Sequence, residues 1–141
     1  MPGTKAYIDT NIILDFLLQR KPFYEDAKLL VAGARDENYE AIVGTYAITD
    51  IHYWLTKETK QSRESLNTIF DLLEIISLQD TVISDMKIAY NSTMLDFEDA
   101  VASAIAQREN ADYIITRNTI DFVNSPVPAI LPSDFITLLK E

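Results

Sequence analysis

The sequence of 141 residues contains no cysteine, which excludes disulfides and thiolate-bound zinc or redox sites. Glycine and proline are also scarce, at three and five residues, and no Ser- or Gly-rich tract marks a linker. No apolar run approaches the roughly 20 residues that cross a bilayer, and the first residues lack the pattern of a secretory signal. We therefore expect one globular domain over residues 1–141, located in the cytoplasm and without a membrane segment.

Basic residues are also in short supply. There are 12 Lys and Arg against 22 Asp and Glu, which gives a formal net charge of −10, and only one His. Broad electrostatic binding to nucleic acid is disfavoured, because such binding neutralises phosphates with Lys and Arg. A nucleic-acid enzyme is not excluded, since divalent cations held by clustered acids would set the local charge. The placement of the acids therefore matters more than their number.

Short apolar segments alternate along the chain with segments of helical periodicity. The expected strands are residues 4–8, 40–43, 75–78 and 113–116, with a possible edge strand at 127–131. The expected helices are residues 12–20, one with Pro22 in its first turn, 45–57, 61–74, one capped by Asp80 that runs to residue 90, 97–109, and a C-terminal one capped by Ser133. This order predicts an α/β fold, a three-layer sandwich with a central parallel sheet of four to five strands and helices on both faces.

The first expected strand runs directly into Asp9, Thr10 and Asn11. A parallel strand that ends there delivers a carboxylate to the carboxyl edge of the sheet, where open α/β folds build their ligand crevices. The same residue types are preferred helix N-caps, because a side-chain oxygen accepts a free N–H of the first helical turn. By itself this segment favours a cap over a catalyst, and further acids directed at the same edge would shift the balance.

Asp50 lies near the second turn of the expected helix 45–57, where its neighbours at helical spacing include Tyr46, Tyr53 and Trp54. A carboxylate on such an apolar and aromatic face is costly unless it meets a cation or strong donors. We interpret Asp50 as a functional acid, with an ion-paired Asp at the rim of an aromatic cluster as the alternative. The aromatic side chains either pack in the core or offer a surface to bases or to another protein chain.

Three further acids, Asp96, Glu98 and Asp99, surround the start of the expected helix 97–109. Asp96 suits the N-cap, and the helix dipole favours Glu98 and Asp99 in the first turn. Asp99 differs from the other two because small residues share its side of the helix. These predict close packing against the sheet, which would hold Asp99 at the crevice.

Thr116, Arg117 and Asn118 follow the fourth expected strand directly, and Asp121 comes shortly after them. Asn and Asp after a strand are most often turn and cap residues. The position of this strand beside the first one favours a shared site instead. Arg117 is the first cation that we would expect to hold a phosphate there.

Four segments thus direct Asp9, Asp50, Asp99 and Asp121 to one edge, because crossover helices begin at the edge where the parallel strands end. Carboxylates that converge without Lys or His repel one another, so divalent metal is normally needed to keep them charged. Hard oxygen ligands favour Mg²⁺ or Mn²⁺ over zinc. Such ions lower the pKa of bound water and neutralise phosphate oxygens, so the implied reaction is phosphodiester hydrolysis.

The four segments that carry these acids are Tyr7-Ile8-Asp9-Thr10-Asn11, Ala47-Ile48-Thr49-Asp50-Ile51, Asp96-Phe97-Glu98-Asp99-Ala100, and Ile115-Thr116-Arg117-Asn118 followed by Asp121-Phe122. In this order they resemble the motifs of PIN-domain nucleases. The closest likeness is to small bacterial single-domain members of the kind found as toxins in VapBC-type toxin-antitoxin pairs. The resemblance covers essentially the whole chain and rests on the four segments together, since each is short.

The resemblance implies an endoribonuclease that depends on Mg²⁺ or Mn²⁺ and acts on single-stranded or looped RNA. It also implies a homodimer and a cognate antitoxin protein as partner. Carried over by position, Asp9 and Asp99 would be the principal metal ligands, and Asp121 a further ligand, direct or through water. Asp50 stands where the family more often has Glu, and Asn118 where it often has Asp. These departures weaken the expectation of a second metal ion more than that of the first.

The remaining polar residues of the motifs would support the metal ligands. Thr10, Asn11 and Thr116 would orient the carboxylates, and Asp96, Arg117 and Asn118 would complete the site. Two other functions stay open at this point. One is a catalytically silent PIN-like module that binds RNA or protein. The other is a receiver-type phosphoacceptor, which is disfavoured because a single acid follows the first strand and no Lys ends the last one.

Overall fold

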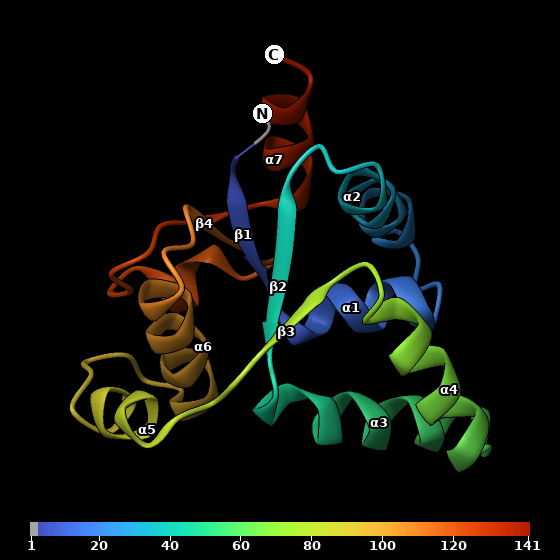
Figure 1. The fold of residues 1–141 in the computed structure, drawn as a ribbon, viewed down its shortest axis with the longest axis horizontal. Coiled ribbons are helices and arrows are strands. Elements are labelled where there is room, and N and C mark those ends of the chain that lie inside the picture. The colour runs from blue at the N-terminus through green and yellow to red at the C-terminus, as the bar shows by residue number, and fades with distance from the viewer. Residues whose placement is uncertain (1–2) are drawn as a thin grey trace.

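A computed structural model describes residues 3–141, in which five parallel strands form one sheet in the order β3-β2-β1-β4-β5. Helices cover both faces of this sheet, which confirms the expected three-layer α/β architecture (Figure 1). The elements are β1 (Lys5–Ile8), α1 (Thr10–Leu17), α2 (Tyr24–Arg35), β2 (Glu40–Gly44), α3 (Tyr46–Thr59), α4 (Ser62–Leu72), β3 (Ser77–Gln79), α5 (Ile83–Tyr90), α6 (Phe97–Arg108), β4 (Tyr113–Ile115), η1 (Thr119–Phe122), β5 (Ala129–Ile130) and α7 (Pro132–Leu139).

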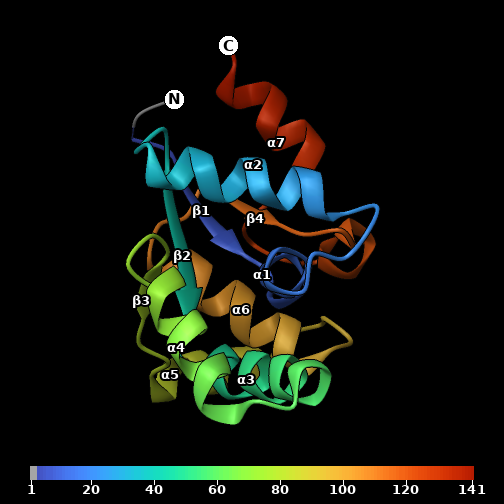
Figure 2. The ribbon, with the colours of Figure 1, turned by 90° about the vertical axis from the view of Figure 1, so that its right-hand side faces the viewer.

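The helices divide between the two faces as right-handed crossovers require. Helices α1, α2 and α7 lie on one face, and α5 and α6 pack together on the other (Figure 2). Helix α3 lies beyond the carboxyl ends of the strands and packs against α1 and α4. Within residues 3–141, no helix has both the length and the apolar character that spanning a membrane requires.

The core of the sheet is the run of apolar residues in its three central strands. Tyr7 of β1 pairs with Ile42 of β2 and with Ile114 of β4, and all three side chains are buried. On the opposite face of the sheet from α2, seven consecutive residues of α6, Ala100–Ala106, are buried. Small side chains permit this close approach to the strands, and the expectation of tight packing for α6 is therefore confirmed.

β1 is the strand at which successive strands stop being added to one side of the sheet and begin to be added to the other. The chain moves from β1 to β2 and β3 on one side, and returns across the sheet to add β4 and β5 on the other side. In open parallel sheets, ligands bind outside the carboxyl ends of the strands at such a reversal. The crevice between β1 and β4 is thus the place where the topology favours a site.

Two predicted helix caps are wrong. Helix α5 begins after Val82 and not after Asp80, because the carboxylate of Asp85 reaches back to accept the Val82 N–H at 2.9 Å. Helix α7 begins at Pro132, whose fixed backbone angle suits a first helical position, so Ser133 lies inside the first turn. Pro22 lies in the turn before α2, which begins at Tyr24.

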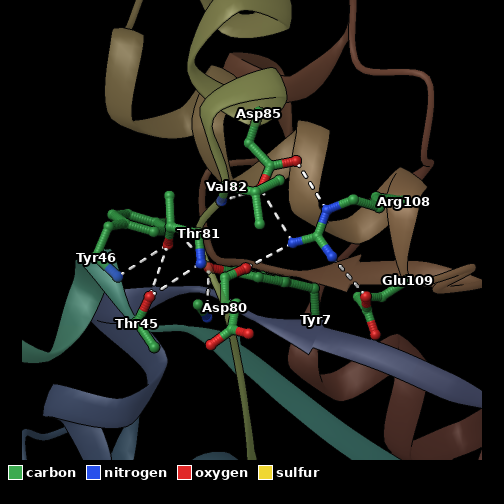
Figure 3. Close-up of polar contacts among 10 residues, drawn as sticks. Tyr7, Thr45, Tyr46, Asp80, Thr81, Val82, Asp85, Arg108 and Glu109 are labelled. Carbon is green, nitrogen blue, oxygen red and sulfur yellow. Dashed lines mark hydrogen bonds and ion pairs between the residues drawn. The ribbon is translucent and has the colours of Figure 1, made fainter.

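Threonine side chains hold the start of α3 against the loop before α5. The Thr45 and Thr81 hydroxyls lie 2.9 Å apart, the Thr81 N–H donates to Thr45 Oγ1, and the Tyr46 N–H donates to Thr81 Oγ1 (Figure 3). The bond from Tyr46 satisfies a backbone donor in the first turn of α3, which has no partner within the helix. Together, these hydrogen bonds also fix the position from which α3 runs along the carboxyl edge of the sheet.

Candidate active site

An acidic cavity of about 280 Å³ lies at the carboxyl edge of β1 and β4. Its walls come from the start of α1, from α3, from the start of α6 and from η1. Among the described residues, none that lines it is Lys, Arg or His. Six carboxylates line the cavity, those of Asp9, Asp50, Asp96, Glu98, Asp99 and Asp121. The other residues that line it are Thr10, Asn11, Leu14, Trp54, Asn118 and Phe122.

Asp9 is placed by the two central strands. Its backbone is extended at the N-cap position of α1, yet its side chain makes no capping hydrogen bond to that helix. Instead, the Thr116 hydroxyl donates to Asp9 Oδ2 at 2.8 Å, and the same hydroxyl accepts the Asn118 N–H at 3.0 Å. The interpretation of Asp9 as a simple helix cap therefore fails, and Thr116 orients the carboxylate as expected.

The start of α6 brings three carboxylates to the cavity. Asp96 is the N-cap, as expected, and its side chain accepts the Asp99 N–H at 2.9 Å. This bond holds the first turn so that Glu98 and Asp99 both line the cavity. Sequence reasoning missed Glu98, which we had interpreted as a helix-dipole residue. Its place in the first turn of a helix that begins at the carboxyl edge was the available signal.

The other two walls supply Asp50 from α3 and Asp121 from η1. All four acids that the sequence directed to one edge thus line one cavity. Asn118, the N-cap of η1, lines it as well but brings no charge. Trp54, for which the sequence left open both core packing and a surface for bases, also lines the cavity, and its spacing of four residues from Asp50 puts both on one side of α3.

Crowding of acids raises the pKa of several carboxyls. Burial, followed by the charges of Asp96, Asp9, Asp121 and Glu98, raises the pKa of Asp99 to about 7. Burial also raises the pKa of Asp9, against the opposing effect of the Thr116 hydrogen bond. The pKa of Glu98 is raised by burial and then by the charge of Asp50. Without a counterion, the site thus favours the protonated form of these groups.

The donor set of the cavity suits a hard divalent cation, because carboxylate, amide and hydroxyl oxygens are the ligands that Mg²⁺ and Mn²⁺ prefer. A cation would also remove the repulsion that raises these pKa values. Among residues 3–141, however, no group of three or more His, Asp and Glu side chains stands in a metal-holding arrangement. The carboxylates are close enough to perturb one another but would have to move to bind one ion together.

Arg117 is not in the cavity. Its guanidinium binds the fully buried Asp15 through Nε to Oδ2 at 2.8 Å and Nη2 to Oδ1 at 3.2 Å, and stacks 3.8 Å from the Phe23 ring centre. Arg20 lies 3.6 Å from the same carboxylate. The expectation that Arg117 holds a phosphate is therefore not supported, because a buried acid in α1 engages it. Its charge nevertheless lowers the pKa of the nearby Asp9.

Two hydrogen-bonded tyrosines, the buried Tyr7 and the half-buried Tyr46, connect elements that form the cavity. Tyr7 Oη donates to Tyr46 Oη at 2.9 Å and accepts the Gly44 N–H at 3.0 Å. A Cβ at Gly44 would lie 2.7 Å from Ile105 Cδ1 and 2.8 Å from the Tyr46 ring, so only glycine fits between α6 and this ring. Burial raises the pKa of both tyrosines, so they stay protonated. The pair links β1, β2 and α3, close enough to Asp9 and Glu98 for their charges to raise the pKa of both tyrosines further.

Comparison with solved structures shows the same fold in bacterial proteins. The VapBC-1 structure from nontypeable Haemophilus influenzae matches with a TM-score of 0.69 at 16% identity, over 92% of this chain and 99% of that one. A toxin-antitoxin complex from Klebsiella pneumoniae gives 0.66 at 21% identity, over 90% and 97%. Mycobacterium tuberculosis VapC20, described as a sarcin-ricin loop cleaving toxin, gives 0.63 at 12% identity, over 77% and 86%.

None of the curated proteins compared with the chain matches it significantly. A family model described as PIN domain matches residues 5–120. The matched range contains the segments that supply Asp9, Asp50 and Asp99, and it ends one residue before Asp121. Fold, order of segments and family model agree, and the chain belongs to the PIN domain family.

Proposed function

We propose that this protein is a metal-dependent endoribonuclease that hydrolyses RNA phosphodiester bonds with Mg²⁺ or Mn²⁺. The observation that carries the proposal is the cavity in which acids from four separate segments meet at the reversal of strand order. Acids that crowd together without a basic residue destabilise the fold unless a cation or a proton joins them. Local destabilisation of the fold by crowded carboxylates is typical of a functional site.

In this proposal Asp9, Asp99 and Asp121 hold the metal ion, and Asp50 and Glu98 flank it. When bound, the ion supplies a water of lowered pKa and neutralises charge on the phosphate oxygens. Thr116 keeps Asp9 in one orientation through its hydroxyl donor. The Asp96 cap keeps the backbone of Asp99 in place.

We further propose that the protein is the toxin of a toxin-antitoxin pair and is held inactive by a cognate antitoxin protein. Support comes from the solved relatives, two of which are described as a VapBC structure and as a toxin-antitoxin complex. From the resemblance of its motifs to PIN-domain toxins we also propose a homodimer. Expression of the wild-type chain should arrest growth of a bacterial host, whereas Asp99→Asn should not. Growth that is equal for both at equal protein levels would contradict the toxin proposal.

The deciding experiment is calorimetric titration with Mn²⁺, with cleavage of an unstructured RNA followed in parallel. We expect binding and cleavage by the wild type and the loss of both in Asp9→Asn and Asp99→Asn. Asp71→Asn, an exposed acid of α4 outside the cavity, is the matched control and should behave as the wild type. Circular dichroism of each variant shows whether the fold persists.

A folded wild-type protein that binds no Mn²⁺ at millimolar concentration would instead support a catalytically silent module. Two observations leave room for that function. Asn118 contributes no charge, and the acids of the described residues do not stand in a metal-holding arrangement.

A further inference from the structure

Trp54 connects the acidic cavity to an exposed aromatic surface on α3. It lines the cavity, yet its side chain is 38% exposed, and the neighbouring Tyr53 is 57% exposed. The two rings meet edge to face with their centres 5.2 Å apart. The alternative that these two residues pack in the core is therefore wrong, whereas Tyr46 does pack against the core.

A lysine completes this surface. The ammonium of Lys57 lies 4.9 Å from the centre of the Trp54 ring. Lys57 is exposed and takes part in no ion pair among residues 3–141. Arg117, by contrast, is committed to Asp15. Lys57 thus offers a charge next to the cavity that a phosphate can take without breaking a salt bridge.

We propose that Tyr53, Trp54 and Lys57 form a subsite that stacks one unpaired base of the RNA beside the cleaved phosphate. The inference rests on the proposed nuclease function and adds a binding site to it. Aromatic side chains stack on any base, and a nearby cation binds the adjoining phosphate. Paired bases are already stacked within a duplex, so the subsite selects a nucleotide that lies in a single strand or a loop.

Charge favours nucleic acid as the occupant of this surface. The cavity carries six carboxylates and repels phosphate, so a substrate needs a source of affinity outside it. Stacking supplies affinity without a positive field, which a chain with a net charge of −10 lacks. Lys57 then supplies local attraction where the backbone enters the cavity. An acidic protein segment would gain from Lys57 but would meet the same repulsion from the cavity without a base to stack.

The experiment uses the fact that Trp54 is the single tryptophan of the chain, so intrinsic fluorescence reports on this ring alone. Wild-type protein is titrated with an unstructured RNA octamer in two buffers. One contains EDTA, and the other contains Mg²⁺ and is read in the first second after mixing. We expect quenching by the octamer and about tenfold weaker binding when its central nucleotides are abasic. The same octamer in a blunt RNA duplex should leave the emission unchanged. A DNA octamer tests whether the ribose contributes, because stacking itself is common to both.

Variants separate stacking from a structural role. By fluorescence anisotropy of a labelled RNA, Trp54→Ala should bind about tenfold more weakly and raise the KM with little change in kcat, whereas Trp54→Phe should retain most of the affinity. Lys57→Gln should weaken binding several-fold and make it less sensitive to salt. Phe70→Ala removes another exposed aromatic, on α4 and outside the cavity, and should change neither quantity.

The outcomes for the subsite and for the nuclease are distinguishable. RNA cleavage by the wild type, with unchanged affinity and KM in Trp54→Ala, would overturn the subsite and leave the nuclease intact. Quenching by single-stranded RNA without cleavage in any metal would retain the subsite and overturn the nuclease. Emission that shifts with protein concentration alone, and is insensitive to RNA, would show that a second copy covers Trp54 and would overturn the inference.

Discussion

Asp9 and Asp99 show how single carboxylates are positioned in the acidic cavity. The Asp9 carboxylate would be an ordinary helix cap if it bonded to α1, but instead it accepts a hydrogen bond from the hydroxyl of Thr116, the residue after β4. Asp99 lies in the first turn of α6, where burial and then the charges of four other acids raise its pKa to about 7. Each carboxylate is therefore held where its charge is costly, which is a property of binding sites rather than of stable surfaces.

The raised pKa of Asp99 predicts how metal-free stability depends on pH. Between its ordinary value of 3.8 and about 7, the folded state keeps a proton that the unfolded state releases. The free energy of unfolding should therefore fall as pH rises through this window. In Asp99→Asn this loss disappears, so in EDTA the variant should exceed the wild type in Tm by more at pH 8 than at pH 5. Asp71→Asn is the control, and an equal Tm difference at both pH values would contradict the assignment.

Removal of the Thr116 hydroxyl should weaken the site without changing its shape. Thr116→Val leaves Asp9 and the Asn118 N–H without their partner, which should cost about 1 to 2 kcal/mol of stability. Loss of orientation should also lower the affinity for Mn²⁺ about tenfold. Thr116→Ser keeps the hydroxyl and should retain most of both. Calorimetry and thermal unfolding measure the two effects, and wild-type metal affinity in Thr116→Val would argue that Asp9 needs no orientation.

At the scale of elements, an ion pair between a partly exposed arginine and a buried acid joins α6 to α5. Arg108 Nε and Nη2 each lie 3.0 Å from an oxygen of the fully buried Asp85, and Nη2 also donates to the Asp80 carbonyl (Figure 3). Asp85 in turn caps α5 through Val82. The far end of α6 is thus clamped to α5, while its near end presents acids to the cavity.

Breaking this clamp should be costly, because it leaves Asp85 buried without its cation. We expect Arg108→Met to lower the free energy of unfolding by roughly 3 kcal/mol. Arg35→Met removes an exposed pair with Asp36 and should cost less than about 1 kcal/mol. Urea denaturation compares the two variants. Equal losses would mean that Asp85 finds another partner.

The elements were largely predictable from the sequence, because their apolar periodicity is local. Their starts were not always predictable, since the start of α5 depends on the Asp85 carboxylate reaching back to the Val82 N–H and not on the presence of Asp80.

The gathering of acids at the site was predictable from topology, which sends Asp9 and its partners to one edge of the sheet. Arg117 was misassigned because its guanidinium is engaged by Asp15, and a buried acid in an apolar helix was the clue that a cation had to meet it. Exposure of Trp54 depends on tertiary packing and was left open.

For the whole molecule, net charge and topology have opposite effects on the attraction of nucleic acid. The net charge of −10 repels nucleic acid, whereas the sheet gathers its acids where a divalent ion would reverse the local field. Under the proposed function, affinity for RNA would then come from few contacts. The basic residues on the Trp54 side of the molecule, Lys57, Lys60 and Arg63, lie on exposed positions of α3, its C-cap and α4.

This balance predicts a weak dependence of RNA binding on salt. Each phosphate neutralised in a single strand contributes a slope of roughly −0.7 to log K against log salt, so three cations give a slope no steeper than about −2. Binding of the labelled octamer between 50 and 200 mM KCl, at constant Mg²⁺, measures it. A slope several times steeper would reveal a basic surface that the structure does not display, and Lys60→Gln with Arg63→Gln should flatten the measured slope.

The contact between Thr116 and Asp9 joins residues 107 positions apart in the chain. Because a ribosome makes the amino terminus first, Asp9 emerges long before β4 and η1 exist to pair with it. A nascent chain therefore carries most of its acids with no cavity to hold them. For a protein proposed to cut RNA, no activity is then expected until the chain has been made through β4 and η1.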